Sequence, residues 1–239
     1  MKRNAALIKK MTTQKLIDKI TKQIDQILNE SGLIVFSSVD TLVKGDIYTL
    51  GLNPGGEAKI PIIKTILEFP SRHHNAYIDE NWGNRKKAKY PVGGHPLQRN
   101  FTGLIRAIGY EPDKVFSSNL IFTRSRGQNN SHYPDNANLC WTVHKEFINI
   151  VDPNCFIVFG NSNISPYQFI KDKYSLKTND SISSGHGNWK CFSASGIIEG
   201  RERILIGIPH LSRYYVTRHD NVIKWINTII TLYCSKSVY

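Results

Sequence analysis

Hydrophobic positions recur along the chain in two ways, at helical spacing and in short runs that are wholly apolar. Leucines and isoleucines from Leu16 to Leu28 recur every three or four residues, which predicts an amphipathic helix over residues 12–30. A threonine at its start can cap this helix, and Ser31-Gly32 ends it. The same spacing predicts further helices over residues 59–69, 97–108, 139–151, 165–173 and 217–234.

Short apolar runs between these helices predict strands. They cover residues 46–52, 115–122, 155–159 and 204–208, and residues 33–39 are a further strand or strand-like stretch. Apolar strands that alternate with helices are typical of a parallel sheet covered on both faces. The pattern therefore predicts an α/β fold, in which ligands bind at the carboxyl ends of the strands.

Neither an internal repeat nor a low-complexity linker divides the chain, so we expect one domain over residues 1–239. The segment 70–96 is polar, basic and rich in turn residues, and it carries Arg85 and Lys86. A loop of this length inside a compact domain is usually functional or mobile. We therefore treat residues 70–96 as a basic loop insertion.

Charge and cysteine content narrow the class of protein. Lys and Arg number 31 against 19 Asp and Glu, a net charge of +12, which raises the rate of encounter with polyanions. This charge is found equally in proteins without a nucleic-acid partner. The four cysteines form no C-x-x-C pair and have no histidine at a spacing that suggests a zinc finger, which predicts reduced core residues, no metal site and a cytoplasmic location. No apolar run approaches the roughly 18 residues of a membrane span, so we expect no membrane association.

Unusual polar sequence follows three of the predicted strands. The first is Gly51-Leu52-Asn53-Pro54-Gly55, where the proline and glycines predict a tight turn with the Asn53 side chain over the end of the sheet. Taken alone, this sequence is more typical of a plain turn.

The second strand end carries Asn119, and the third carries His210. Asn119 lies in an apolar strand, so its amide either bonds a neighbouring backbone group or reads a base with its donor and acceptor. Arg124 and Arg126 follow it, either as phosphate ligands or as solvated loop charges. A single histidine after a strand is more often structural than catalytic, but three such ends in this order favour a functional site.

These segments resemble the motifs of the uracil-DNA glycosylase superfamily. The sequence GLNPGG at 51–56 is closest to the G-[IM]-N-P-G motif of its mismatch-specific and single-strand-selective monofunctional branches. The sequence HLS at 210–212 resembles the second motif, His-Pro-Ser, with Leu211 in place of proline. Residues 95–104 resemble the H-P-x-x-x-x-F helix start, and residues 153–161 resemble the P-x-x-[IV]-[IV]-x-x-G strand. The resemblance extends from about Asp46 to Trp225.

The resemblance implies a three-layer α/β/α sandwich around a central, mostly parallel four-stranded sheet. It implies a monofunctional DNA glycosylase that needs no cofactor, flips out uracil or a modified pyrimidine and leaves an abasic site. Asn53 would position the attacking water, His210 would donate a hydrogen bond to the departing base, and Asn119 would contact its Watson–Crick edge. The remaining base-binding residues would be Gly51, Leu52, Pro54, Gly55 and Phe69.

The partner implied is DNA, bound by a monomer. Tyr214 and Tyr215 follow the second motif, where the family carries a wedge, although packing under the last helix is an equal alternative. The residues expected to bind DNA are Arg85, Lys86, Arg124, Arg126, Ser212, Arg213, Tyr214 and Tyr215.

Departures from the family pattern leave the substrate open. The tyrosine that closes the pocket against 5-substituted pyrimidines is replaced by Gly55-Gly56, which predicts a roomier pocket. The stacking aromatic is absent from its usual place, and Phe69 lies a little late. Some branches hold an iron–sulphur cluster on four cysteines, but the N-terminal pair is missing, so we expect no cluster.

DNA repair is the default role. Two alternatives remain: an antiviral glycosylase that excises a hypermodified cytosine from viral DNA, and a non-catalytic DNA-binding module on a glycosylase fold. An unrelated small-molecule α/β enzyme would require the three motifs to be a coincidence.

Overall fold

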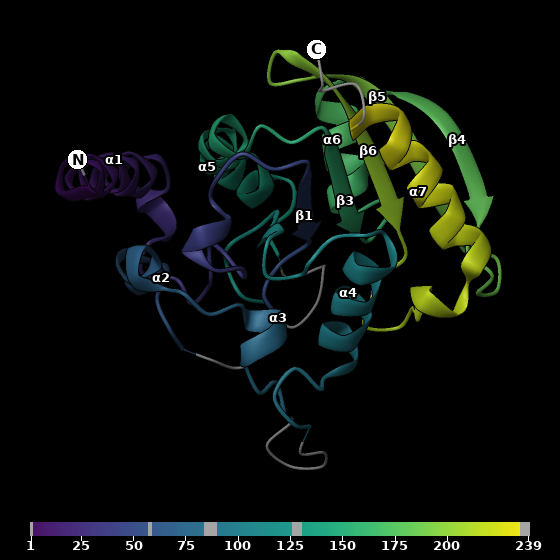
Figure 1. Ribbon diagram of the computed structural model, residues 1–239, viewed down its shortest axis with the longest axis horizontal. Coiled ribbons are helices and arrows are strands. Elements are labelled where there is room, and N and C mark those ends of the chain that lie inside the picture. The colour runs from purple at the N-terminus through teal and green to yellow at the C-terminus, as the bar shows by residue number, and fades with distance from the viewer. Residues whose placement is uncertain (1, 57–58, 84–89, 126–130, 235–239) are drawn as a thin grey trace.

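A six-stranded mixed sheet lies at the centre of the computed structural model, which describes residues 2–56, 59–83, 90–125 and 131–234 (Figure 1). The strand order is β2-β1-β3-β6-β5-β4. The strands are β1 (Ile47–Gly51), β2 (Phe116–Asn119), β3 (Cys155–Phe159), β4 (Lys177–Ser183), β5 (Lys190–Ile198) and β6 (Arg201–Ile208).

The α/β class is confirmed, but the expected four-stranded sheet is wrong. Strands β2, β1, β3 and β6 run parallel, and β5 and β4 extend the sheet antiparallel beyond β6. Strand β4 carries the polar sequence KTNDSIS and only Ile182 is half-buried, so it has no apolar run to reveal it. Strand β5 lies between two antiparallel neighbours, and only Cys191, Ser193, Ala194 and Ile198 are buried along its length, so it also lacks a continuous apolar run.

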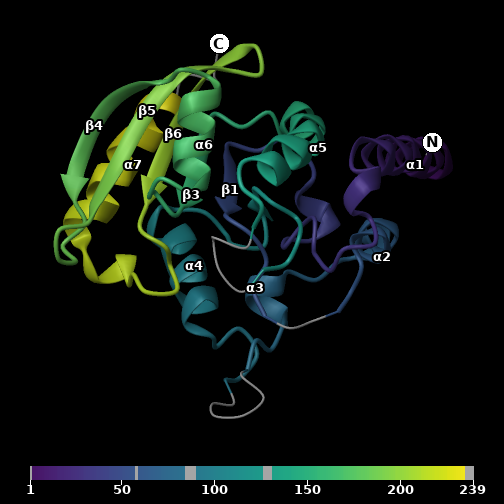
Figure 2. The same ribbon diagram turned by 180° about the vertical axis from the view of Figure 1, so that it is seen from behind.

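Helices cover both faces of the sheet, as Figures 1 and 2 show from opposite sides. Side chains of β3 alternate between two hydrophobic clusters: Phe156 and Val158 face one, and Ile157 and Phe159 face the other. The first cluster includes α1 (Lys2–Gln23), α2 (Ile62–Glu68), α5 (Asp135–Val151) and α6 (Pro166–Lys173), and the second α3 (Ala76–Asp79), α4 (Pro96–Ala107) and α7 (Asp220–Cys234). Short 3-10 turns are η1 (Asp25–Ile27), η2 (Val39–Thr41), η3 (Phe69–Ser71) and η5 (Val216–Arg218).

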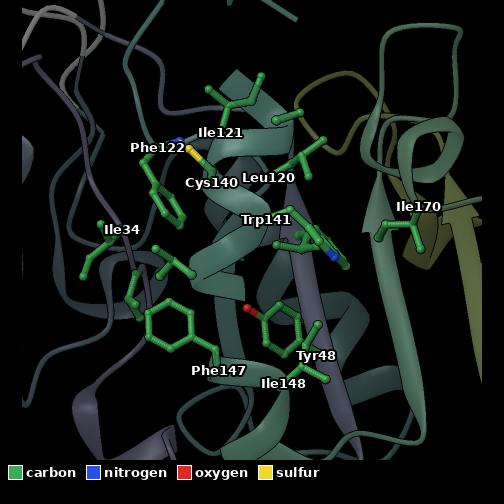
Figure 3. Packing of buried hydrophobic residues seen from close by; sticks show 14 of the residues in the cluster. Ile34, Tyr48, Leu120, Ile121, Phe122, Cys140, Trp141, Phe147, Ile148 and Ile170 are labelled. Carbon is green, nitrogen blue, oxygen red and sulfur yellow. Dashed lines mark hydrogen bonds between the residues drawn. The ribbon is translucent and has the colours of Figure 1, made fainter. Parts of the chain in front are cut away.

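Aromatic rings fill the first cluster between α5 and the sheet. Figure 3 shows Trp141 and Phe147 of α5 beside Tyr48 of β1, and all three are buried. Tyr48 also packs against Phe116 and Phe156 of the neighbouring strands, with ring centroids 4.8 and 5.4 Å away. This packing fixes α5 across the parallel strands.

Several element bounds differ from those expected. The first helix is α1 at Lys2–Gln23 rather than 12–30, and η1 follows it. Residues 33–39 form no strand: Leu33 N–H donates to the carbonyl of Phe122 at 3.0 Å and Phe36 N–H to that of Ser117 at 2.9 Å, so the segment lies along β2 without a regular ladder.

The described part of the loop insertion 70–96 is anchored to α4. It contains η3 and the single turn α3. The buried Gln98 of α4 donates to the carbonyls of Ala76 and Glu80 at 2.8 and 2.7 Å. This segment is therefore held in a defined position near the carboxyl ends of the strands.

Among the described helices, none has the length and apolar character that a membrane crossing requires.

Candidate functional site

A cavity of about 800 Å³ opens at the edge of the sheet where the parallel strands end. Asn53 follows β1, Asn119 ends β2, Phe159 ends β3 and His210 follows β6. All four line this cavity. The fold therefore brings together the three polar residues that the sequence motifs single out, Asn53, Asn119 and His210.

The Asn53 side chain is oriented by its own turn and by a second loop. Its Nδ2 donates to the carbonyl of Pro54 at 2.9 Å and to Oγ of Ser125 at 2.9 Å. Because the Pro54 carbonyl can only accept a hydrogen bond, the amide atom that faces it must be the NH₂ group of Asn53. Within the described residues Oδ1 makes no hydrogen bond, so the Asn53 carbonyl oxygen is available to accept one from a water molecule.

Asn119 presents an amide that no described residue uses. The residue is buried, with 4% of its surface exposed, yet the hydrogen bonds found for it involve only its backbone carbonyl. Because Asn119 lines the cavity, a ligand can reach this amide. A ligand with one acceptor and one donor at adjacent positions could bond both of its polar atoms.

A buried histidine of α5 forms hydrogen bonds with the carboxyl end of β2. His144 Nε2 lies 3.0 Å from the carbonyl oxygen of Asn119 and 3.3 Å from that of Leu120. Carbonyls only accept, so Nε2 carries the proton, and Nδ1 accepts from the Tyr48 hydroxyl at 2.8 Å. Burial lowers the pKa of His144 to about 4, although both carbonyls oppose the shift, so the imidazole is neutral near pH 7. No sequence signal marks His144, because it lies inside an ordinary helical pattern.

Gly51 leaves the space that the Asn119 amide and the Phe159 ring occupy. A Cβ at this position would lie 2.2 Å from Oδ1 of Asn119 and 2.7 Å from Cε2 of Phe159. Both distances are too short for any side chain. Glycine is required here by close approach.

His210 is held as a hydrogen-bond donor toward the cavity. Its Nδ1 accepts from the backbone N–H of Ser212 at 3.2 Å and lies 2.8 Å from the Ser212 hydroxyl. In the neutral ring the proton is then on Nε2. Burial lowers the pKa of His210, and the positive charge of Arg213 lowers it further, so the neutral form prevails near pH 7. Phe159 meets the imidazole edge-on, with ring centroids 6.0 Å apart.

A hydrogen bond from α4 holds the loop after β6 in place. The buried Asn100 donates from Nδ2 to the carbonyl of Leu211 at 2.7 Å. Leu211, which stands where the motif that this segment resembles has proline, is itself fully buried. An apolar anchor and one hydrogen bond thus fix the loop that carries His210.

Another wall of the cavity is aromatic, and the sequence motifs do not mark it. Phe36, Tyr77 and Trp82 contact one another with centroids 5.3 to 6.0 Å apart. Trp82 is the least buried of the three, and its Nε1 donates to Glu80 Oε2 at 2.8 Å. Phe36 and Trp82 lie in irregular segments and Tyr77 in the single turn α3, so no periodicity marks these rings. A tryptophan inside a polar loop is the one signal that could have found them.

A polar network lies against this aromatic wall. Glu80 Oε1 accepts from Arg72 at 3.0 Å and lies 3.3 Å from Nε2 of His74, and all three residues line the cavity. Burial lowers the pKa of Arg72, and Glu80 opposes the shift. The cavity therefore contains charged groups in addition to the three neutral polar groups at the strand ends.

Arg124 is half-buried and lines the cavity. Its guanidinium donates to the carbonyl of Gly55, and its Nε is buried without a partner in the described part of the chain. Burial lowers the pKa of Arg124, against the attraction of Glu80. The arginine braces the glycine turn after β1, which makes it more than a solvated loop charge.

Two expected site residues lie in the core. Phe69 is 1% exposed, packs near Phe147 at 6.4 Å and does not line the cavity, so it is not the base-stacking ring. Tyr214 is fully buried, donates from its hydroxyl to the carbonyl of Ser184 at 2.7 Å and stacks on His219, so it is not an exposed wedge.

The other expected residues lie at the cavity or beside it. Pro54 and Gly55 line the cavity, whereas Leu52 packs against the first hydrophobic cluster. Arg213 and Tyr215 are exposed on the loop after His210, and Ser212 is half-buried. Arg85, Lys86 and Arg126 lie outside the described residues.

Among the residues described, no three histidine, cysteine, aspartate or glutamate side chains form a group that could hold a metal ion. The four cysteines are free, and three of them are buried. No protein-family model and no curated protein matches this chain.

Proposed function

We propose that this protein is a monofunctional DNA glycosylase of the uracil-DNA glycosylase superfamily, which excises uracil or a modified pyrimidine. One observation carries the proposal. Asn53, Asn119 and His210 converge on one cavity at the carboxyl ends of parallel strands, each with a hydrogen-bonding group that no described residue uses.

The imidazole is suited to assist departure of the base. When the bond between C1′ and the base nitrogen breaks, its electron pair goes to the base, and negative charge develops on the base oxygen. A neutral His210 with its proton on Nε2 can donate a hydrogen bond to that oxygen. A preorganised donor of this kind stabilises the transition state more than the ground state.

The two amides are suited to the water and to the base. Oδ1 of Asn53 can accept a hydrogen bond from the water that adds to C1′, and the water's proton finally balances the charge of the released base. An amide is a poor base, so orientation rather than deprotonation is its contribution. The Asn119 amide offers the donor and acceptor needed to pair with a pyrimidine edge.

An abasic-site assay tests the proposal. Labelled duplexes and single strands would carry uracil, thymine opposite guanine, or 5-substituted cytosines, and alkali would cleave wherever a base is lost. We expect cleavage at one kind of base. His210→Ala should reduce this cleavage roughly 100- to 1,000-fold, the cost typical of one oxyanion donor, and Asn53→Ala should abolish it.

Two matched surface variants provide the controls. Asn179→Ala and His73→Ala replace the same residue types at exposed positions whose side chains do not line the cavity, and both should retain full activity. Intact strands throughout, with DNA still bound, would refute the glycosylase and leave a non-catalytic DNA-binding module.

The size of the cavity favours a second candidate, an antiviral glycosylase that excises a hypermodified cytosine. About 800 Å³ lies within the roughly 300–1,000 Å³ typical of pockets for drug-sized ligands, and it is far more than one pyrimidine ring needs. Its lining includes Arg72, His74 and Glu80, which excision of a plain base would not use. Cleavage at glucosylated hydroxymethylcytosine but not at uracil in the same assay would select this candidate.

A further inference from the structure

The turn between β4 and β5, residues 184–189, lies at the same edge of the sheet as the cavity. Phe192 pairs with Gly207, so β5 begins where β6 ends, just before His210. The Tyr214 hydroxyl donates to the carbonyl of Ser184, which joins this turn to the loop after His210. Figures 1 and 2 both show the turn beside the segment that leads into α7.

The backbone of the turn is well fixed. Ser184 N–H donates to the carbonyl of Trp189 at 2.9 Å, and Trp189 N–H donates to that of His186 at 3.2 Å. Gly185 packs so closely that a Cβ there would lie 2.5 Å from Nδ1 of His219, and its φ is +74°. The turn is therefore a firm support and not a freely moving loop.

This support presents an indole to solvent. Trp189 is 41% exposed, and its ring contact within the described residues is with His186, at 4.7 Å. A fixed turn that leaves much of a tryptophan uncovered supplies a flat surface on which another ring can stack at little entropic cost.

Further aromatic and cationic groups lie on the adjoining loop. Tyr215 is 38% exposed, and the Arg218 guanidinium lies 4.7 Å from its ring centroid. Arg213, between His210 and Tyr215, is exposed as well. Exposed rings interleaved with arginines match the chemistry of single-stranded nucleic acid, in which bases stack and phosphates pair with cations.

We propose that the β4–β5 turn is a second nucleic-acid contact, in which Trp189 stacks on an unpaired base of the strand that flanks the excised nucleotide. Tyr215 stacks on the same strand, and Arg213 and Arg218 neutralise its phosphates. The inference rests on the proposed function only in that DNA is the ligand, because binding at the turn requires no excision.

Binding to DNA that contains no excisable pyrimidine tests this contact separately from catalysis. The full chain would be titrated against a fluorescent single strand of adenines and against a duplex of the same length, with anisotropy as the readout. We expect Trp189→Ala to bind the single strand roughly five- to 150-fold more weakly, as the loss of one stacked base predicts, with a much smaller effect on the duplex. The single strand should also quench the tryptophan fluorescence of the wild type more than that of Trp189→Phe.

Matched variants separate stacking from charge and from general exposure. Trp189→Phe should recover part of the affinity, and Ile197→Ala, which removes a side chain 59% exposed near the other end of β5, should change nothing. Arg213→Ala should reduce the salt dependence of binding by about one phosphate contact, whereas Trp189→Ala should leave it unchanged.

Unchanged single-strand affinity in Trp189→Ala, with the variant folded as judged by its melting temperature, would overturn the inference. Equal losses on single strand and duplex, or an equal loss in Ile197→Ala, would overturn it as well. A protein that binds the adenine strand through Trp189 but excises nothing would keep this inference and refute the glycosylase.

Discussion

Mild acid should destabilise the protein through His144, the buried imidazole behind β2. Its Nε2 donates to the carbonyl of Asn119 and its Nδ1 accepts from Tyr48, so the folded state holds the neutral ring. Burial lowers its pKa to about 4, whereas an unfolded chain has the ordinary value near 6.5. Above about pH 6.5 the ring is neutral in both states, and below it only the unfolded chain takes up a proton.

The size of the effect follows from this difference in pKa. Stability that is fully present above the unfolded pKa is lost as the pH falls toward the folded pKa. Each unit of difference corresponds to about 1.4 kcal/mol, so the free energy of unfolding should fall by about 2 kcal/mol between pH 7 and pH 5 through His144 alone.

Urea unfolding of the wild type and of His144→Gln at several pH values measures this contribution. Burial also lowers the pKa of His95 and His210, so the wild-type slope contains more than one histidine, and the difference between the two proteins isolates His144. Tyr48→Phe provides the matched control, because it removes the partner of Nδ1 but keeps the titrating ring. It should lose stability at every pH but keep a pH dependence, shallower than that of the wild type, because burial still lowers the pKa of His144 after the Tyr48 donor is lost.

Parallel curves of unfolding free energy against pH for wild type and His144→Gln would refute this reasoning. That result would mean that His144 titrates alike in the folded and unfolded states, and that the Asn119 end of β2 is not held by a neutral imidazole.

Two further substitutions probe how the site is supported. Gly51→Ala places a Cβ 2.2 Å from Oδ1 of Asn119, so it should cost about 1–3 kcal/mol of stability, as overpacking does. It should also lower the rate of excision and raise KM. Normal kinetics would show that the Asn119 amide does not touch the base. Asn100→Ala leaves the buried carbonyl of Leu211 without its donor and should cost about 1–3 kcal/mol in urea unfolding, together with a lower kcat, while the exposed Asn179→Ala should change neither quantity.

The sequence was most informative where strands are short and wholly apolar. The run at 155–159 has the bounds of β3, because a strand buried on both faces admits no polar residue. Once such strands are placed, parallel pairing brings their carboxyl ends to one edge of the sheet. Asn53, Asn119 and His210 lie at or just after these ends, so they come to the same edge. For this reason the convergence of the three motifs could be predicted without knowing the helix bounds.

Features that depend on tertiary contacts could not be predicted. Whether Phe69 and Tyr214 face the cavity or the core is decided by how neighbouring helices pack, and both lie in the core. Trp82 comes from an irregular loop held by Gln98, and no periodic pattern marks such a segment. The polar strand β4 is stabilised by its pairing with β5 rather than by its own apolar residues.

The two edges of the sheet are closed in different ways. At one edge the segment 33–37 covers β2, with Phe36 and Ser37 donating to the carbonyl of Ser117. At the other, no further strand of the described residues borders β4. Its register with β5 shifts between Thr178 and Asp180, and all of its polar residues are exposed. An incoming strand would find neither a regular row of free backbone groups nor an apolar face. The extension that widens the sheet by two strands thus also guards it against edge-to-edge aggregation.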